Sequence, residues 1–331
     1  MTSLPEVAPT PLEEAEAEAA FSAILDGTVP DESIAPFLVA LTERGETASE
    51  IAGAARAMRA RMIPISAPEG AIDVCGTGGD GHHTLNVSTA VSLVVAACGV
   101  PVAKHGNRAA SSKAGAADTL EALGLNLDRA AETAELTLND LGICFLFAQK
   151  HHPALARIAP IRKALGRRTI FNLMGPLANP ARVRRQLVGI ARPAYVPIYA
   201  EAIRRLGTEH SLVVSGDEGL DELSLAGGNE LAEVKDSNVL MRRVTPADAG
   251  LASAPVEALR GGDPAYNAAA LRALLQGEPG PYRDAVLFSS AAALMIAGEA
   301  ADWHEGVEEA AEAIDKGLAN ALLNCWIAAL K

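Results

Sequence analysis

The chain has 331 residues and a formal net charge of −13 at pH 7, with 28 Lys and Arg against 41 Asp and Glu. This acidic balance argues against a general nucleic-acid-binding protein, which needs a basic surface. Apolar residues make up 49% and aromatic residues 4% of the sequence, which favours a globular protein of helices packed on a sheet. The amino-terminal segment lacks the features of a signal peptide, and no apolar run is long enough to cross a bilayer. We therefore expect a cytoplasmic protein without a membrane partner.

The first part of the chain is predicted to be helical. Apolar residues recur there at helical spacing in three stretches, which are Leu12–Leu25, a second between Pro30 and Gly45, and Thr47–Met62. Thr47 and Glu50 have the spacing of a capping box at the start of the third helix. Two prolines and a glycine between residues 64 and 70 then indicate a hinge.

Short apolar runs alternate with helical segments after this hinge. The predicted strands are Ala71–Cys75, Val100–Ala103, Ile143–Phe147, Leu187–Ile190 and Ser211–Val214. The predicted helices include Ser88–Cys98, Lys113–Leu123 and most of Tyr266–Leu330, with a break at residues 277–281. This alternation predicts an α/β fold in which a small all-helical domain precedes a large α/β domain with a mostly parallel central sheet. Ligands of such sheets gather at the carboxyl ends of the strands.

The four cysteines indicate no disulfide framework or zinc site. They form no CxxC pair and lie in apolar runs, so we expect buried free thiols at Cys75, Cys98, Cys144 and Cys325. The histidine pairs His82-His83 and His151-His152 do not have metal-ligand spacing with any cysteine.

A glycine-rich loop, GTGGDG, follows the first predicted strand at Gly76–Gly81. It matches GxGxxG, but a dinucleotide site needs a helix that begins within the motif and an acidic residue at the end of the next strand. Here His82–Thr84 intervene and the next strand ends in Lys104. The loop is therefore interpreted as a backbone cradle for an anion, with Asp80 available to a hydroxyl or a metal-bound water. A tight turn without a ligand is the alternative.

A second donor-rich loop, KHGNRAASSK, follows the second predicted strand. Its cations beside glycine, asparagine and serines favour contact with a polyphosphate, whereas His105 is either a substrate contact or an ordinary hydrogen-bonding histidine. The helix start at Asn86–Thr89 supplies side chains that either cap the helix or contact phosphate or a hard cation.

An acidic loop at Gly216–Glu222 carries four carboxylates. Acidic loops are usually solvated, but Asp221 and Glu222 stand between two leucines. Because Mg²⁺ is held by one or two carboxylates together with substrate oxygens, we expect them to bind a metal. In the basic segment Arg157–Arg168, one arginine can pair with a substrate carboxylate, and the others are expected to be solvated.

Together these segments resemble the anthranilate phosphoribosyltransferases. The motifs GTGGDG, NVSTA, KHGNRAASSKAGAAD, RKALGRRTIFNLMGPLANPA and GLDELS have the order and spacing of that family, and GPYRD at residues 280–284 belongs to the same pattern. The resemblance covers residues 12–330. It implies transfer of a phosphoribosyl group from phosphoribosyl pyrophosphate to anthranilate in tryptophan biosynthesis. It also implies two Mg²⁺ ions per subunit, and a homodimer formed through the helical domains. The helical domain would comprise residues 1–68 with a segment near 162–182, and the α/β domain residues 70–331.

The resemblance also implies site residues. The phosphoribosyl pyrophosphate positions are Gly76, Gly79, Asp80, Thr84, Asn86, Val87, Ser88, Thr89, Lys104, His105, Gly106, Asn107, Arg108, Ala109, Ala110, Ser111, Ser112 and Ala116. The anthranilate positions are Gly76, Asn107 and Arg162, with His105 and Gly175 nearby, and the metal positions are Ser88, Asp221 and Glu222. No nucleophile or general base is implied, and the electrostatic role falls on Lys104, Asp221 and Glu222.

The chain departs from the family pattern at six positions that do not remove a charge from the expected site: Ala109, Ala114, Ala116, Gln149, Ser215 and Ser289. The alanines place the corresponding hydroxyl contacts in question. A related nucleoside phosphorylase is the alternative enzyme, and the KHGNR and RTIFN segments argue against it. A nucleic-acid-binding protein built on the same fold is disfavoured by the net charge.

Overall fold

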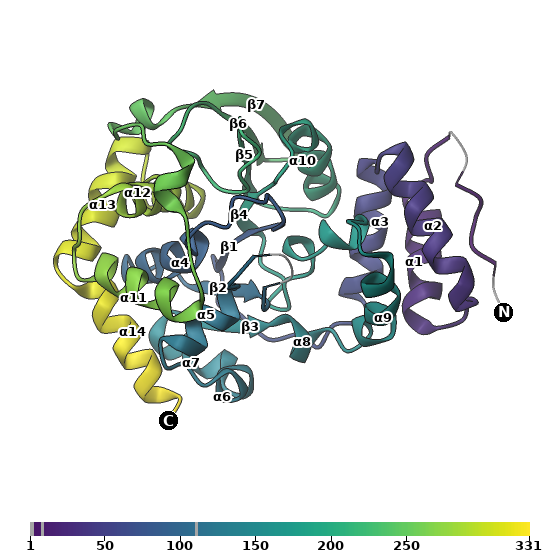
Figure 1. Ribbon diagram of the computed structural model, residues 1–331, viewed down its shortest axis with the longest axis horizontal. Helices are drawn as coiled ribbons and strands as arrows, with labels where there is room; N and C mark the ends of the chain where they lie inside the picture. The colour runs from purple at the N-terminus through teal and green to yellow at the C-terminus, as the bar shows by residue number, and fades with distance from the viewer. Residues whose placement is uncertain (1–2, 8–9, 110–111) are drawn as a thin grey trace.

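A helical bundle lies beside a sheet that carries helices on both faces, in a computed structural model that describes residues 3–7, 10–109 and 112–331 (Figure 1). The amino-terminal bundle consists of α1 (Glu14–Asp26), α2 (Asp31–Arg44) and α3 (Ala48–Arg59). The predicted capping box of Thr47 and Glu50 is present at the start of α3. Gly27 ends α1 with a φ of 71°, a conformation that side chains disfavour. The three predicted helices are therefore confirmed, with ends within a few residues of those expected.

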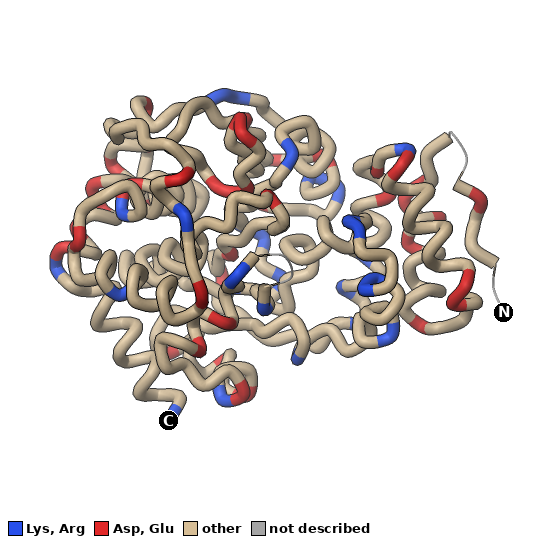
Figure 2. Tube along the Cα trace, viewed as in Figure 1, with Lys and Arg blue, Asp and Glu red and all other residues tan. Residues whose placement is uncertain are grey.

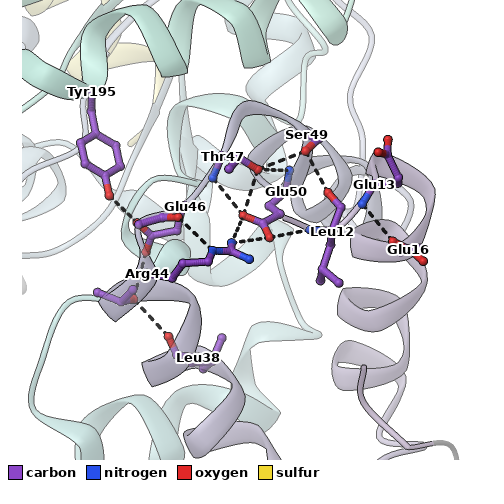
Figure 3. Close-up of polar contacts among 12 residues, drawn as sticks. Leu12, Glu13, Glu16, Leu38, Arg44, Glu46, Thr47, Ser49, Glu50 and Tyr195 are labelled. Carbon is purple, nitrogen blue, oxygen red and sulfur yellow. Dashed lines mark hydrogen bonds and ion pairs between the residues drawn. The ribbon is translucent and has the colours of Figure 1, made fainter. Parts of the chain in front are cut away.

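A polar network fixes the end of the bundle that meets the sheet (Figure 3). The buried carboxylate of Glu50 accepts a hydrogen bond of 3.0 Å from the Leu12 amide and pairs with Arg44. Glu46, also buried, accepts a hydrogen bond of 2.6 Å from the hydroxyl of Tyr195. Because Tyr195 directly precedes α10 (Val196–Arg205), this contact joins the bundle to the sheet region.

Seven strands form one sheet in the order β3-β2-β1-β4-β5-β6-β7. Their bounds are β1 (Ile72–Gly76), β2 (Val102–Gly106), β3 (Ile143–Phe147), β4 (Arg185–Gly189), β5 (His210–Gly216), β6 (Asn229–Lys235) and β7 (Asn238–Val244). The first five strands are parallel, and β6 and β7 are antiparallel. The chain runs outward from β1 to β3 and returns to β4 on the other side of β1. The carboxyl ends of β1 and β4 therefore form a topological switch point, where open α/β sheets bind ligands.

Helices cover both faces of the sheet. Those after β1 are α4 (Val87–Ala97), α5 (Ala116–Ala122), α6 (Leu127–Glu132), α7 (Ala134–Leu141), α8 (Ala148–His151), α9 (Leu155–Leu165), α10 (Val196–Arg205), α11 (Pro264–Leu275), α12 (Pro281–Ala297), α13 (Trp303–Asp315) and α14 (Leu318–Ala329). Short 3-10 helices are η1 (Ile170–Asn172), η2 (Pro176–Ala178), η3 (Pro193–Tyr195), η4 (Pro246–Ala249) and η5 (Val256–Leu259).

Alternate residues of β1 enter two separate cores, as the pleat of a strand requires. Ile72 and Val74 pack in a core with α4 and the carboxyl-terminal helices. Cys75 lies in a second core, which joins the opposite face of the sheet to the helical bundle and to the segment after α9. Phe21 of α1 and Phe171 of η1 meet edge to face in this second core, with ring centroids 5.5 Å apart. The segment after α9 is thus anchored on the bundle.

The predicted fold class is confirmed, and its five strands correspond to β1–β5. Strands β6 and β7 were not predicted, and the helix expected from Lys113 begins at Ala116. All four cysteines are free, but the burial expected of them is confirmed only for Cys75 and Cys144, because Cys98 is half-buried and Cys325 is exposed on α14. None of the helices in the described residues is long and apolar enough to cross a membrane.

Candidate active site

Two glycines occupy the topological switch point. Gly76 ends β1, Gly189 ends β4, and the two are register partners in the sheet. A Cβ atom at Gly76 would overlap the carboxylate of Asp221, and one at Gly189 would overlap the main-chain carbonyl of Asp221. The acidic loop after β5 can therefore cross the ends of both strands only because neither position has a side chain.

Two of the four carboxylates of this acidic loop, those of Asp221 and Glu222, face the first glycine-rich loop and the start of α4. Asp221 Oδ2 accepts a hydrogen bond of 2.5 Å from the amide of Gly78, and Glu222 Oε1 accepts one of 3.1 Å from the amide of Ser88. Burial raises the pKa of Asp221, and the carboxylates of Asp80 and Glu222 raise it further. Burial likewise raises the pKa of Glu222 to about 7, although Lys104 counteracts this.

Lys104 is 2% exposed and lies between carboxylates. Its Nζ donates to the carbonyl of Val74 at 2.8 Å and to Ser88 Oγ at 3.3 Å. Burial lowers the pKa of Lys104, whereas the negative charges of Asp73 and Glu222 raise it. Asp73 is itself buried, and it accepts a hydrogen bond of 3.1 Å from the His105 amide. The single ammonium group therefore balances part of the negative charge around it.

The donor set around Asp221 and Glu222 fits a hard divalent cation. Both side chains are half-buried, and their raised pKa values show that ionisation costs free energy at this place. A bound cation would remove that cost. Among the described residues no group of three or more His, Cys, Asp or Glu side chains could hold a metal. An ion here would need further oxygens, and Ser88 together with a phosphorylated substrate can supply them.

Asn86 connects the start of α4 to the end of the second loop. Its side chain was predicted to cap α4 or to contact a ligand, but no capping hydrogen bond is present. Instead Asn86 Nδ2 donates to the carbonyl of Ala114 at 3.2 Å, and its Oδ1 accepts from Thr119 and from Asn267. Asn86 thus holds the end of the second loop against the start of α4, and the capping alternative is wrong for Asn86.

The arginine of the second loop forms ion pairs with the helix that follows it. Arg108 pairs with Asp118 and Glu121 of α5, and its guanidinium lies 5.7 Å from the ring centroid of Phe147. Asp118 also accepts hydrogen bonds of 2.9 Å from the amides of Ala109 and Gly115. Ala110 and Ser111 lie outside the described residues, and Ser112 is exposed.

Family models match both the helical bundle and most of the α/β region of this architecture. The helical bundle domain of the glycosyl transferase family matches residues 8–62, and the a/b domain of that family matches residues 68–320. The anthranilate phosphoribosyltransferase of Novosphingobium aromaticivorans is 84% identical over 331 residues, which cover 100% of both chains. The chain belongs to the anthranilate phosphoribosyltransferase family.

Solved anthranilate phosphoribosyltransferases have the same fold. The enzyme of Thermus thermophilus is 45% identical with a TM-score of 0.90, covering 98% of this chain and 97% of that one. The enzyme of Saccharomyces cerevisiae, in complex with PRPP and Mg, is 27% identical with a TM-score of 0.89. The match covers 96% of this chain and 93% of the yeast chain. A further structure of the yeast enzyme contains 4-fluoroanthranilate, at 26% identity and a TM-score of 0.86, with the same coverage.

The positions that the family likeness assigns to anthranilate are only partly brought together. His105 Nδ1 lies 3.0 Å from the carbonyl oxygen of Gly175, and its Nε2 lies 3.2 Å from Nε2 of His152. Burial lowers the pKa of His105 to about 3, so this imidazole is neutral. Arg162 is half-buried over the ring of Phe171, at 5.6 Å from its centroid. No hydrogen bond joins Arg162 to His105 or Gly175 among the described residues.

The remaining positions assigned to phosphoribosyl pyrophosphate differ in what they can offer. The side chains of Val87 and Thr89 are buried, so Val87 can contact a ligand only through its backbone. The Thr89 hydroxyl is buried without a partner among the described residues. Asn107 is exposed and accepts a hydrogen bond of 2.8 Å from the Arg108 amide. In the first loop Gly79 is exposed and Asp80 is half-buried, and Thr84 pairs in a bridge with Arg260.

Sequence reasoning missed two residues, one that contacts the first loop and one that contacts the start of α4. Arg168 donates to main-chain carbonyls of the first loop, and the hydroxyl of Tyr282 donates to the carbonyl of Asn86 at 3.2 Å. Arg168 was grouped with the solvated arginines after α9, where Lys and Arg gather between the sheet and the bundle (Figure 2). The GPYRD motif singled out the segment of Tyr282, but nothing in the sequence distinguished Arg168 from Arg167.

Proposed function

We propose that the chain transfers the 5-phosphoribosyl group of phosphoribosyl pyrophosphate to the amine of anthranilate, giving N-(5-phosphoribosyl)anthranilate and pyrophosphate. The observation that carries the proposal is the full-length 84% identity to a relative of that activity. The cluster of Lys104, Asp221 and Glu222 at the switch point supports it, because it suits a polyphosphate with a divalent cation.

Catalysis in this proposal is electrostatic. The bond from the ribose C1 to pyrophosphate breaks, a bond from C1 to the anthranilate nitrogen forms, and the nitrogen releases one proton to water. The enzyme must therefore accommodate charge on the leaving group. Lys104, fixed by Val74 and Ser88, would face this charge together with the free amides of the first loop. Mg²⁺, when bound at Asp221, Glu222 and Ser88, would neutralise the pyrophosphate further. No protein nucleophile is needed, because a cation-like sugar reacts with a weakly basic amine.

Arg162 is proposed to bind the anthranilate carboxylate. A guanidinium forms two parallel hydrogen bonds with a carboxylate, and that of Arg162 has no hydrogen-bond or ion-pair partner among the described residues. Burial lowers its pKa, so an anionic ligand would relieve the cost of this half-buried charge. His105, Gly175, Asn107 and Gly76 would line the same substrate.

The first loop, Asn86, Ser88, Thr89 and the second loop are proposed to hold the ribose and its phosphates. We further propose two Mg²⁺ ions per subunit and a homodimer through the helical bundle, in the cytoplasm, where the free cysteines would stay reduced. Residues 1–68 and a segment near 162–182 would act as one domain, because α9 and η1 share a core with α1 and α2. Mass in solution and the stoichiometry of Mg²⁺ binding in the presence of pyrophosphate test these assignments.

The activity is tested by following the loss of anthranilate fluorescence with phosphoribosyl pyrophosphate and Mg²⁺. Arg162→Ala should raise the KM for anthranilate at least about tenfold, the loss expected for a charged hydrogen-bond pair. The KM for phosphoribosyl pyrophosphate should change little. Lys163→Ala is the matched control, because Lys163 is exposed on the same helix turn. Equal effects of Arg162→Ala on both KM values would exclude the assigned role, and no anthranilate loss by the native chain would refute the function.

A further inference from the structure

Arg168 connects the segment after α9 to the first glycine-rich loop. Its Nη1 donates to the carbonyl of Gly78 at 2.7 Å and to that of Gly79 at 2.8 Å. A Cβ atom at Gly79, where φ is +74°, would overlap this guanidinium nitrogen. The loop is therefore shaped around the guanidinium, and the fit depends on glycine at that position.

The same loop is held from its other side by the acidic loop. The amide of Gly78 donates to Asp221, and the amide of Thr77 donates to the carbonyl of Gly189 at 2.9 Å. Gly78 thus makes two hydrogen bonds: its N–H donates to Asp221, and its C=O accepts from Arg168. Gly78 and Gly79 are otherwise exposed, and glycine-rich backbone loses much conformational entropy when it is ordered. The contacts with Asp221 and Arg168 therefore contribute to the order of the loop around Gly78 and Gly79.

The carbonyls bound by Arg168 belong to the peptide units that supply the amides of Gly79 and Asp80. Neither of these two N–H groups donates to another of the described residues. Hydrogen bonds in series polarise one another, so a cation bound to a peptide carbonyl strengthens the N–H of that peptide as a donor. Two polarised amides without partners are the arrangement that binds an anion.

We propose that Arg168 is a positioning residue that presents the amides of Gly79 and Asp80 to the pyrophosphate group. The proposal rests on the proposed function, since it concerns the site for phosphoribosyl pyrophosphate. Arg168 acts from a segment anchored on the bundle through Phe171 and Phe21, whereas the loop belongs to the sheet. Movement of the bundle away from the sheet would withdraw the guanidinium, so the order of the loop depends on the position of the bundle.

The first test needs no substrate. Hydrogen exchange at the amides of residues 77–82 is compared in native protein, Arg168→Ala and Arg167→Ala. Arg167 is the matched control, because it is exposed and pairs with Glu43 at 3.2 Å instead of the loop. Arg168→Ala should speed exchange in this loop about tenfold, whereas Arg167→Ala should leave it unchanged. Equal exchange in all three proteins would overturn the proposal whatever the activity.

The second test separates positioning from general stability. Arg168→Ala should raise the KM for phosphoribosyl pyrophosphate about tenfold and the KM for anthranilate less than about twofold. Arg168→Lys, which retains one donor group, should recover part of the loss and serves as the variant if the alanine protein does not fold. Faster exchange with unchanged KM values would show a structural contact only and overturn the positioning role. Inactive native protein would refute the proposed function, and the exchange data would then decide the loop contact alone.

Discussion

Replacing Glu222 by glutamine should make the metal-free protein less sensitive to rising pH. Burial raises the pKa of Glu222 to about 7 from an ordinary value of 4.5. A carboxyl group with a raised pKa in the folded state stabilises the fold while it is protonated, and this contribution is lost as the pH rises from about 4.5 through 7. Glutamine resembles the protonated form and does not titrate.

The size of the effect follows from the same two values. Their difference corresponds to about 3 kcal/mol of unfolding free energy, which the remaining solvent contact of the half-buried side chain reduces to about 2 kcal/mol. A chain of 331 residues loses about 0.7 kcal/mol per degree near its unfolding midpoint. The difference in Tm between Glu222→Gln and the native protein should therefore grow by about 3 °C in favour of the variant between pH 4.5 and pH 8.5.

The assay is thermal unfolding followed by circular dichroism in chelator at the two pH values. Other titrating groups are common to both proteins and cancel in the difference. Excess Mg²⁺ with pyrophosphate should reduce the Tm difference between the two proteins at pH 8.5. A bound cation removes the free-energy cost of the charged Glu222 carboxylate in the native protein. A Tm difference that is the same at both pH values would refute the reasoning about Glu222.

Three further outcomes follow from contacts of the same region. Asp221→Asn combined with Glu222→Gln should lower turnover by at least about a hundredfold or sharply raise the Mg²⁺ requirement in the anthranilate assay; unchanged metal dependence would contradict the assigned metal site. Gly189→Ala should cost about 3 kcal/mol in denaturant unfolding and lower activity, because its methyl group displaces the backbone of Asp221; native stability would show that the acidic loop can move aside. Tyr195→Phe should cost about 1 kcal/mol by removing the hydrogen bond to buried Glu46 (Figure 3), and a Tm equal to that of the native protein would exclude a role for this contact.

The parts of the fold that the sequence predicts are those with clear periodicity. Strands β1–β5 are short buried runs between turn residues, so their apolar pattern is sufficient to find them. Strand β7 was missed because most of its side chains are exposed, and it is held by pairing with β6 instead of by burial. Such an edge hairpin does not have the apolar run that marks a buried strand.

In the candidate site, too, residues with an unusual local pattern were singled out from the sequence, and residues that act through tertiary contacts were not. Asp221 and Glu222 were singled out because two carboxylates between leucines are unusual in a solvated loop. Asp73 was taken as part of an apolar strand, although its buried carboxylate influences Lys104. Arg168 was overlooked because its neighbour Arg167 has the same local pattern, and only the folded chain places one of them against Gly78 and Gly79. Residues that act through tertiary contacts leave no mark on local spacing.

The paired glycines at the ends of β1 and β4 restrict how this fold can diverge. Gly76 lies in a recognisable motif, whereas Gly189, its partner in the sheet, ends an unremarkable strand. A distant chain that retains the GTGGDG loop but carries a larger residue at the second position could not bring an acidic loop over the switch point without moving its backbone. The residue at the end of the fourth strand is therefore a simple filter for assigning function to remote relatives, and a position that a redesigned enzyme with new substrates would have to keep.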